Sequence, residues 1–281
     1  MTVTQDNAPM RGPAFLRTLR GRLVVLTLAV LVPAILLSGL LLWSAQAQAR
    51  RSIEGQLRET TQALALVVDR QLGEQASMLS ALMTSPSFKA GDWPAFDRQV
   101  REVFPNFHTA LVVVDEEGQQ LINTRLSPGA PLPRTLMPAS FWAGTTKAGA
   151  KVSNLALGPV IRQQVIAVAR EVRLDDGQWV RISITTLASE FGSVFKDQRL
   201  PATWTGSLID GSGAVITRSR DAEKMIGRRA TPDILQALRT APSGVIKSQT
   251  LDGIKTYSAF SKSPGYGWAI LVGVPRAEIP V

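Results

Sequence analysis

The feature that most constrains this chain is an uncharged apolar stretch at residues 23–43, LVVLTLAVLVPAILLSGLLLW. As a helix rising about 1.5 Å per residue, its 21 residues cover a hydrocarbon core of about 30 Å. Pro33 is compatible with a membrane helix, because neighbouring groups in a membrane protein can satisfy the carbonyl that proline leaves free. A helix buried in a water-soluble core would normally carry a polar stripe, and this stretch has none. We therefore predict a transmembrane helix over residues 23–43.

A cleaved signal peptide is the main alternative, because residues 45–47 (AQA) form a small-residue cleavage pattern. The apolar region of a signal peptide spans roughly 7–15 residues, and the present stretch is longer, which favours an uncleaved anchor. Basic residues are retained on the cytoplasmic side of a membrane, and four of them precede the span. We therefore predict that residues 1–22 are cytoplasmic and that the rest of the chain lies on the other side. The four basic residues are Arg11, Arg17, Arg20 and Arg22.

Composition disfavours several classes of function. The net charge of +9 is spread along the chain, with little of the basic–aromatic interleaving that follows a phosphate backbone, so we expect no nucleic-acid partner. The sequence has no cysteine, which excludes disulfides, thiolate metal sites and cysteine nucleophiles. His108 is the single histidine and the chain has no G-x-S-x-G motif, so a zinc site and a serine triad are both disfavoured. We predict no catalytic residue, no metal and no cofactor.

A long amphipathic helix is expected directly after the span, over residues 44–87. Its apolar residues recur at spacings of three, four or seven, with Glu, Gln and Arg between them. Two interpretations of this stripe are open: it forms the seam of a homodimer through this stalk helix, or it covers the chain's own β-sheet. The stripe consists of Ile53, Leu57, Leu64, Val68, Leu72, Leu79 and Leu82.

An internal duplication follows the stalk. The apolar run 110–114, an Asp-Glu-Glu-Gly turn and a second strand at 119–124 form a predicted hairpin, and residues 207–217 repeat this plan. Asp115 and Asp210 lie 95 residues apart, each three residues before a glycine. In such turns Asp bonds the local backbone and Gly supplies a positive φ. The repeat predicts two copies of a five-stranded unit.

The remaining predicted elements complete these two units. Asp92 is a suitable N-cap for a short helix that begins with Trp93 and Pro94. Further helices are predicted over residues 138–147, over 187–196 and after Thr231. Strands are predicted within 160–172 and over 179–185, 245–248, 256–261 and 268–274.

This order of elements resembles the double Cache domain, the extracytoplasmic sensor of many bacterial histidine kinases, diguanylate cyclases and chemoreceptors. The resemblance is closest to the kinases. It is carried by LVVVDEEGQQLINTR (111–125), PGAPLPR (128–134), SLIDGSGAVITRSRDAEKMIGR (207–228), the segment 243–268 and VGVPRAEI (272–279). It covers almost all of residues 44–279, and its specificity lies in the order of the motifs.

The resemblance implies an α+β fold, in which a long N-terminal helix (transmembrane plus stalk) is followed by two PAS-like antiparallel-sheet lobes. It implies a membrane-distal lobe at 88–200 that binds a small-molecule ligand. A membrane-proximal lobe at 201–279 would transmit the change that ligand binding causes in the distal lobe. The implied location is the bacterial inner membrane, with a single pass, a cytoplasmic N-terminus and the bulk of the chain in the periplasm.

Three functions remain open at this point, and the third of them is a membrane-anchored enzyme. Members of the family normally continue beyond the PRAEI-like stretch into a second membrane helix and an output domain, whereas this sequence ends at Val281. We therefore expect no catalytic output within it. The first interpretation is the ligand-sensing module of a histidine-kinase receptor. The second is a stand-alone tethered binding protein that pairs with a full-length receptor.

The candidate ligand site lies in the distal lobe. Amino-acid-binding members carry an Arg near a Trp-Tyr pair and an Asp shortly after, whereas this chain has Phe141-Trp142 and no Asp in 152–157. A small organic anion is therefore favoured over an amino acid. Arginines in this lobe could bind such an anion, because a half-buried guanidinium needs a carboxylate or a bound anion. The predicted ligand-binding residues are Arg125 at a strand end, Arg134 in a loop, Trp142 as an apolar wall, Asn154 in the strand expected to carry the Asp, and Arg170 on the face of Ile166 and Val168.

Overall fold

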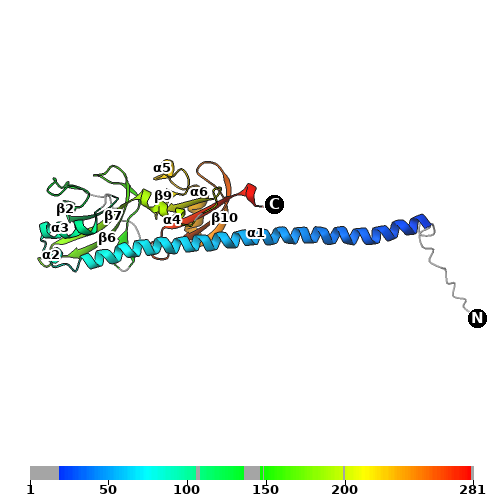
Figure 1. The fold of residues 1–281 in the computed structure, drawn as a ribbon, viewed down its shortest axis with the longest axis horizontal. Coiled ribbons are helices and arrows are strands. Elements are labelled where there is room, and N and C mark those ends of the chain that lie inside the picture. Colours follow the sequence, from blue (N-terminus) through cyan, green and yellow to red (C-terminus); the bar gives the residue numbers. More distant parts are fainter. Residues whose placement is uncertain (1–18, 106–107, 136–145, 148, 199, 280–281) are drawn as a thin grey trace, which may run out of the picture. The chain divides into compact units, whose positions relative to one another are not determined.

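The computed structural model describes residues 19–105, 108–135, 146–147, 149–198 and 200–279. The chain divides into two compact units, Met1–Ser52 with Pro280–Val281, and Ile53–Ile279. Helix α1 (Leu19–Leu82) has 64 residues, includes Pro33 and contributes to both units (Figure 1). In the first unit the described apolar side chains of this helix are exposed, and that of Leu36, for example, is 67 % exposed. Across the described residues, no helix reaches the length and hydropathy expected of a membrane span.

The second unit contains two antiparallel sheets, which we call the first and second lobes in chain order. The first sheet has seven strands in the order β2-β1-β7-β6-β4-β3, and β5 pairs with β6. Its strands are β1 (Thr109–Asp115), β2 (Gln120–Asn123), β3 (Thr146–Lys147), β4 (Ala150–Val152), β5 (Ala156–Leu157), β6 (Gln164–Arg173) and β7 (Trp179–Leu187).

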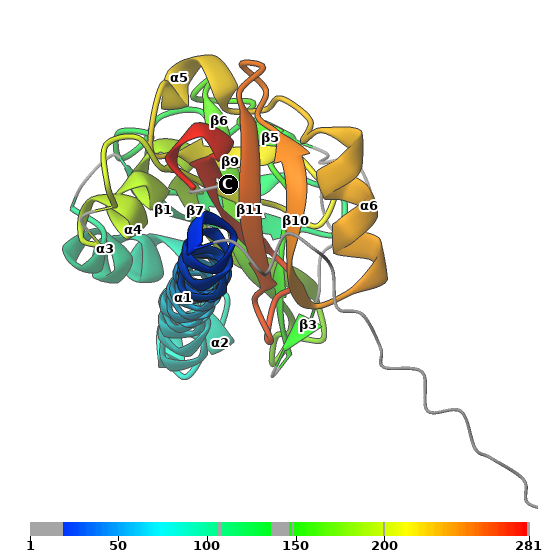
Figure 2. The ribbon, with the colours of Figure 1, turned by 90° about the vertical axis from the view of Figure 1, so that its right-hand side faces the viewer.

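The second sheet has five strands in the order β10-β11-β12-β8-β9. Helix α6 lies beside β10, as Figure 2 shows. The strands are β8 (Thr205–Ile209), β9 (Val215–Arg218), β10 (Ser243–Gln249), β11 (Lys255–Lys262) and β12 (Ala269–Pro275). The remaining helices of the unit are α2 (Pro86–Lys89), α3 (Trp93–Val103), η2 (Ala188–Gly192), α4 (Ser193–Lys196), α5 (Ala222–Met225), α6 (Pro232–Thr240) and η3 (Arg276–Glu278).

The apolar stripe of α1 is buried within the chain itself. Leu57, Leu64, Val68, Leu72 and Leu79 are fully buried, in one core cluster with the facing residues of both sheets. Burying a Leu or Val side chain contributes roughly 1.5–3 kcal/mol, so this stripe is a major source of stability. Of the two interpretations of the stripe, the structure supports the one in which it covers the chain's own sheets.

The duplication is confirmed at the level of individual hydrogen bonds. In both hairpins the Asp carboxylate, of Asp115 or Asp210, accepts hydrogen bonds from backbone amides of its own turn, and the strand pair is interrupted at the corresponding residue. The same backbone hydrogen bonds recur 95 residues apart: Gln120 N to Pro133 O and Val215 N to Arg228 O, Thr124 N to Leu111 O and Ser219 N to Gly206 O, Thr135 N to Gly118 O and Ala230 N to Gly213 O.

Several boundaries differ from the sequence-based expectations. Helix α1 ends at Leu82, five residues before the predicted end of the stalk at 87. The predicted helix 187–196 is a 3-10 helix, η2, continued by the single α-turn of α4. The predicted helix 138–147 falls mostly on residues outside the described part of the chain. Its last two residues form strand β3, which pairs with β4, so a helix is wrong there.

Candidate functional site

A cavity of about 120 Å³ opens on the face of the first sheet that is opposite α1. Alternate residues of β7 separate the two faces. Arg181, Ser183 and Thr185 line the cavity, whereas Ile182 and Ile184 are buried in the core beside α1. Because successive side chains of a strand point to opposite faces, this alternation gives the sheet one polar cavity face and one apolar core face.

Three further strands, β1, β2 and β6, and two loops complete the walls. Strand β1 contributes apolar side chains and β2 contributes the amides of Gln120 and Asn123. The turn between β5 and β6 forms one wall, from Gly158 to Ile161. A Cβ on Gly158 would lie 2.8 Å from the Ile161 side chain, so glycine lets this turn pack closely. A volume of this size holds on the order of ten water-sized groups, which suits a small metabolite.

Arg125 supplies a half-buried positive charge to the cavity. Its guanidinium donates to Thr185 Oγ1 at 2.6 Å, to Thr185 O at 2.9 Å and to His108 O at 3.3 Å, all of which are neutral oxygens. Burial lowers the pKa of Arg125 from its ordinary value to about 10, because desolvation disfavours the charged guanidinium. An anion bound in the cavity would favour the charged form of Arg125.

A chain of amide hydrogen bonds orients the polar wall beside Arg125. Asn123 Nδ2 donates to Gln120 Oε1 at 2.9 Å, and Gln120 Nε2 donates to Thr135 Oγ1 at 2.9 Å. Asn123 Oδ1 accepts from the backbone N of Arg125 at 3.1 Å. Asn123 and Gln120 are both buried, so their mutual bonds fix which amide atoms face the cavity.

The cavity also has an acidic side. Asp115 and Glu116, at the β1–β2 turn, line it together with the two arginines. One oxygen of Asp115 is used by the turn, where it accepts from Glu117 N at 2.9 Å and Gln119 N at 2.8 Å. Arg181 forms an ion pair with Glu171 across strands β6 and β7. The site therefore offers charges of both signs.

The structure describes four of the five predicted ligand-binding residues and places them at different sites. Arg125 lines the cavity, and Trp142 lies outside the described residues. Arg134 donates to Glu117 O at 2.8 Å and pairs with its carboxylate at 3.1 Å, on the protein surface. Asn154 lies 3.3 Å from the Cβ position of Gly211 in the second lobe. Arg170 is half-buried on the Ile166–Val168 face of β6, away from Val165 and Ala167 of the cavity. A ligand-binding role for these residues stays a prediction.

Among the cavity residues that were not predicted from the sequence, five are polar side chains on β2 and β7. They share a signal that was present: polar residues alternate with apolar ones along β7, and a polar pair flanks the Leu-Ile of β2. Alternation of this kind marks a sheet with one polar face. The five residues are Gln120, Asn123, Arg181, Ser183 and Thr185.

His108 contacts Glu190 on the surface and is not among the residues that line the cavity. Its Nδ1 lies 2.9 Å from Glu190 Oε1, and both side chains are exposed. Within the described ranges, no three His, Asp or Glu side chains are grouped so as to hold a metal ion.

Comparisons with known proteins identify the fold. No protein-family model matches the sequence, and no curated protein matches it either. Among solved structures, the chain is similar to the extracellular domain of rpHK1S-Z16, which is assigned as a histidine kinase, with a TM-score of 0.63 and 17 % identity over 82 % of this chain and 97 % of the other. The ligand-binding domain of the Pseudomonas fluorescens chemoreceptor CtaA, in complex with L-isoleucine, gives a TM-score of 0.61 and 12 % identity over 84 % of this chain and 98 % of the other.

A third similar structure is the ligand-binding domain of the Pseudomonas aeruginosa PAO1 amino acid chemoreceptor PctB with L-Arg. It gives a TM-score of 0.60 and 15 % identity over 83 % of this chain and all of the other. At identities this low, the structural similarity shows the fold and leaves the ligand open. The antiparallel sheet of each lobe, the hairpins repeated 95 residues apart and these similarities agree. The first sheet has seven strands, so the predicted five-stranded unit is confirmed in the second lobe and is wrong in the first. The chain has the two-lobed double Cache fold of the sensor domains of histidine kinases and chemoreceptors.

Proposed function

We propose that this chain is the ligand-sensing region of a membrane receptor of the histidine-kinase type, and that its first-lobe cavity binds a small molecule through a carboxylate. The observation that carries the proposal is the half-buried guanidinium of Arg125 at a cavity of about 120 Å³. Its hydrogen bonds to Thr185 and His108 hold it in place before a ligand arrives. A preorganised donor loses little entropy on binding, which favours affinity.

A small organic anion is the first candidate ligand. Charge-assisted hydrogen bonds from Arg to a carboxylate are the strong ones in proteins, and the apolar residues of β1 and of the 158–161 turn would contact the remainder of the molecule. Arg181 stands at the same cavity and offers a second cation. On the sequence evidence Trp142 would add a further apolar wall.

An amino acid is the second candidate, and one observation favours it. The sequence lacks the expected Asp in 152–157, yet Asp115 and Glu116 line the cavity and offer carboxylates to an α-amine. The similar domains of PctB and CtaA are in complex with amino acids. L-lactate and L-alanine are a matched pair of probes, because lactate carries a hydroxyl where alanine carries an ammonium. Tighter binding of alanine, weakened by Glu116→Gln, would favour the amino acid.

Membrane anchoring forms a further part of the proposal and rests on the uncharged stretch at 23–43. It would place residues 44–279 in the periplasm and residues 1–22 in the cytoplasm. A periplasm-dependent reporter fused after Val281 should be active, and a cytoplasm-dependent one inactive. The opposite pattern would contradict the topology, and a mature N-terminus near Gln48 would show that the anchor is cleaved.

A homodimer through α1 also stays a proposal, and the buried stripe restricts how it could form. The face of α1 available to a second copy is the outer one, where Leu66 is 60 % and Val67 41 % exposed.

The alternative function, a stand-alone tethered protein that pairs with a full-length receptor, would use the same cavity. A kinase fragment encoded beside this gene would favour the receptor over the stand-alone protein.

A thermal-shift screen of the full chain tests the ligand proposal. Small monocarboxylates, dicarboxylates, amino acids, amines and purines should be compared at equal concentration, because a ligand that binds only the folded state raises the melting temperature. We expect stabilisation by compounds that carry a carboxylate. Stabilisation by amines or purines alone would overturn the proposal.

A further inference from the structure

The second lobe contains a cavity at the position equivalent to the first. Its volume is about 60 Å³, and it opens on the face of the second sheet that carries α6. Five residues that line the first cavity correspond, 95 positions later, to five that line the second. Val112, Val114, Gln120, Asn123 and Thr135 correspond to Ser207, Ile209, Val215, Arg218 and Ala230.

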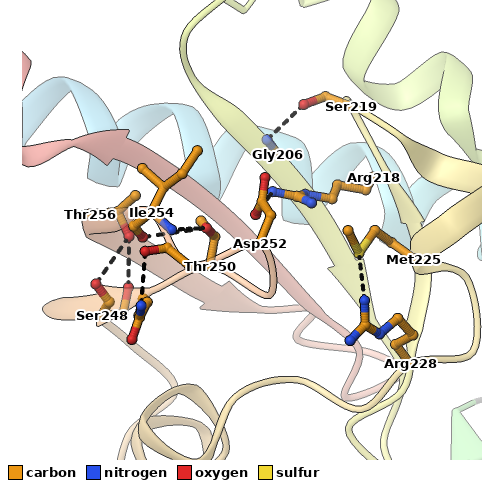
Figure 3. A network of polar contacts seen from close by, with 12 residues as sticks. Gly206, Arg218, Ser219, Met225, Arg228, Ser248, Thr250, Asp252, Ile254 and Thr256 are labelled. Carbon is orange, nitrogen blue, oxygen red and sulfur yellow. Dashed lines mark hydrogen bonds and ion pairs between the residues drawn. The ribbon is translucent and has the colours of Figure 1, made fainter.

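One of these replacements changes the chemistry of the site. Where the first cavity has the amide of Asn123, the second has the guanidinium of Arg218, whose side chain is only 3 % exposed. Its Nη2 donates to Asp252 Oδ1 at 2.7 Å, as Figure 3 shows. Its Nη1 is buried at the same site and has no hydrogen-bond partner among the described residues. Burial without a partner is unfavourable for a charged donor, so this nitrogen is poised to bind an acceptor.

Asp252 neutralises only the outer edge of the guanidinium. Burial would raise the pKa of Asp252, but hydrogen bonds from Thr250 and Arg218 outweigh that effect and hold the pKa below 3.8, so the pair is ionic. The Asp252 side chain is 34 % exposed, at the turn between β10 and β11, and water screens its charge. The inner edge of Arg218 therefore keeps much of its capacity to bind an anion.

A second buried polar group at the same cavity is the hydroxyl of Thr231. Thr231 is the N-cap residue of α6, but its side chain makes no capping hydrogen bond, in contrast to Asp92, which accepts from Ala95 N at 3.1 Å. Its Oγ1 is buried and has no hydrogen-bond partner within the described part of the chain. Arg218 and Thr231 come from separate elements, β9 and α6, and line one cavity.

The other walls restrict the ligand. Apolar side chains form much of the lining. The hydroxyls of Ser248 and Ser258 lie 2.7 Å apart, and both are within hydrogen-bond distance of Thr256. Figure 3 shows Ser248 and Thr256. A volume of about 60 Å³ holds roughly five water-sized groups. A dianion would leave an uncompensated charge against the apolar side. The apolar lining residues are Ile209, Val215, Ile234, Leu251 and Leu271.

We propose that the second-lobe cavity is a separate binding site for a short-chain monocarboxylate, held by Arg218 and Thr231. The carboxylate accepts from Arg218 Nη1 and from the Thr231 hydroxyl. The alkyl chain, of about two carbons, contacts the apolar side of the cavity. The site is independent of the first-lobe cavity, which has its own arginine.

The test uses the full chain carrying Arg125→Gln, so that carboxylate binding in the first lobe is weakened, with sodium propionate titrated and followed by NMR. We expect saturable binding that Arg218→Gln weakens by about tenfold or more and Thr231→Val by about threefold to fivefold. Thr217→Val is the matched control. Its Oγ1 is also buried and has no partner within the described residues, but Thr217 is not among the residues that line the cavity, so affinity should be unchanged.

Thr231→Val leaves the Arg218–Asp252 pair intact, so the test holds even if Arg218→Gln fails to fold. Three results would overturn the site: no saturable binding of propionate, propionamide binding as tightly as propionate, or Thr231→Val and Thr217→Val behaving alike. Because binding is measured without Arg125, a negative result here leaves the first-lobe proposal standing, and the reverse also holds.

Discussion

At the scale of single residues, Gly213 occupies a position that only glycine fits, for two separate reasons. Its φ is +90°, a conformation that L side chains rarely adopt, and a Cβ there would clash with the side chain of Leu235. Gly177 has almost the same φ, +88°, but nothing lies within 4 Å of its Cβ position. Comparing substitutions at these two glycines therefore separates the cost of backbone strain from the cost of steric overlap.

We expect Gly177→Ala to lower the free energy of unfolding by about 1 kcal/mol, and Gly213→Ala to lower it by about 2–4 kcal/mol. The larger loss reflects the overlap with Leu235 in addition to the strain. Denaturant unfolding of both variants measures the difference. Adding Leu235→Ala to Gly213→Ala should reduce the gap by removing the overlap. Equal losses for the two single variants would show that the overlap with Leu235 relaxes without cost.

The site residues show how far sequence reasoning reached at this scale. Arg170 was correctly placed on the face of Ile166 and Val168, but strand alternation does not reveal which face of a sheet carries a cavity and which packs on a helix. That choice is made by α1, which covers the face of Ile166 and Val168. The partner of Arg134 is Glu117 on the neighbouring turn, a contact that only the fold of the 116–135 loop creates. Arg125, predicted at the end of an apolar strand, lines the cavity, and its part in binding stays a prediction.

At the scale of elements, α1 is attached to the last hairpin by a buried polar contact. Asp69 Oδ1 accepts a hydrogen bond from Ser263 Oγ and one of 3.0 Å from Gly265 N, between β11 and β12. On the outer surface of the same helix, Glu74 pairs with Arg70 at 2.9 Å, with both side chains well exposed. These two acidic residues differ in burial and share one helix.

We expect Asp69→Ala to lower the free energy of unfolding by about 1–3 kcal/mol, because it leaves donors of the hairpin without their acceptor. Glu74→Ala should change it by less than about 0.5 kcal/mol, as is usual for an exposed i,i+4 pair. Thermal or denaturant unfolding measures both. A loss for Asp69→Ala no larger than that for Glu74→Ala would mean that packing alone holds α1 to this hairpin.

The elements themselves were largely predictable, because their signals are local. β-Branched runs gave the long strands, Asp92 caps α3 as expected, and the two Asp turns marked the duplication. Short strands were missed: β3 and β5 have two residues each and carry no periodicity of their own. Their conformation comes from pairing with β4 and β6, which is a tertiary effect that a single sequence does not display.

At the scale of the whole second unit, one segment belongs to both lobes. Residues 154–161 include the Gly158–Ile161 wall of the first cavity, and Leu155 N donates to Asp210 Oδ2 in the second lobe at 2.8 Å. Asp210 thus performs the turn function of Asp115 and joins the lobes as well. One core cluster along α1 also includes residues of both sheets. We infer that the lobes unfold together.

Asp210→Asn should weaken this connection, because an amide nitrogen facing Leu155 N presents a donor to a donor. We expect a single unfolding transition with a loss of about 1–3 kcal/mol, together with a change in ligand affinity at the first cavity. Asp115→Asn is the matched variant within the first turn, which makes no such contact between lobes. Two resolved unfolding transitions in calorimetry would contradict the inference that the lobes form one cooperative unit.

The central claim is that Arg125 binds the carboxylate of a small ligand in the first lobe. Calorimetric titration of the most stabilising carboxylate into the parent chain, Arg125→Gln and Arg134→Gln tests it most directly. We predict that Arg125→Gln binds about tenfold to a hundredfold more weakly, at roughly 1.4 kcal/mol per factor of ten, because a charge-assisted pair is lost. Arg134→Gln, on the surface outside the cavity lining, should bind as the parent does. An Arg125→Gln variant that binds the carboxylate as tightly as the parent would contradict the account.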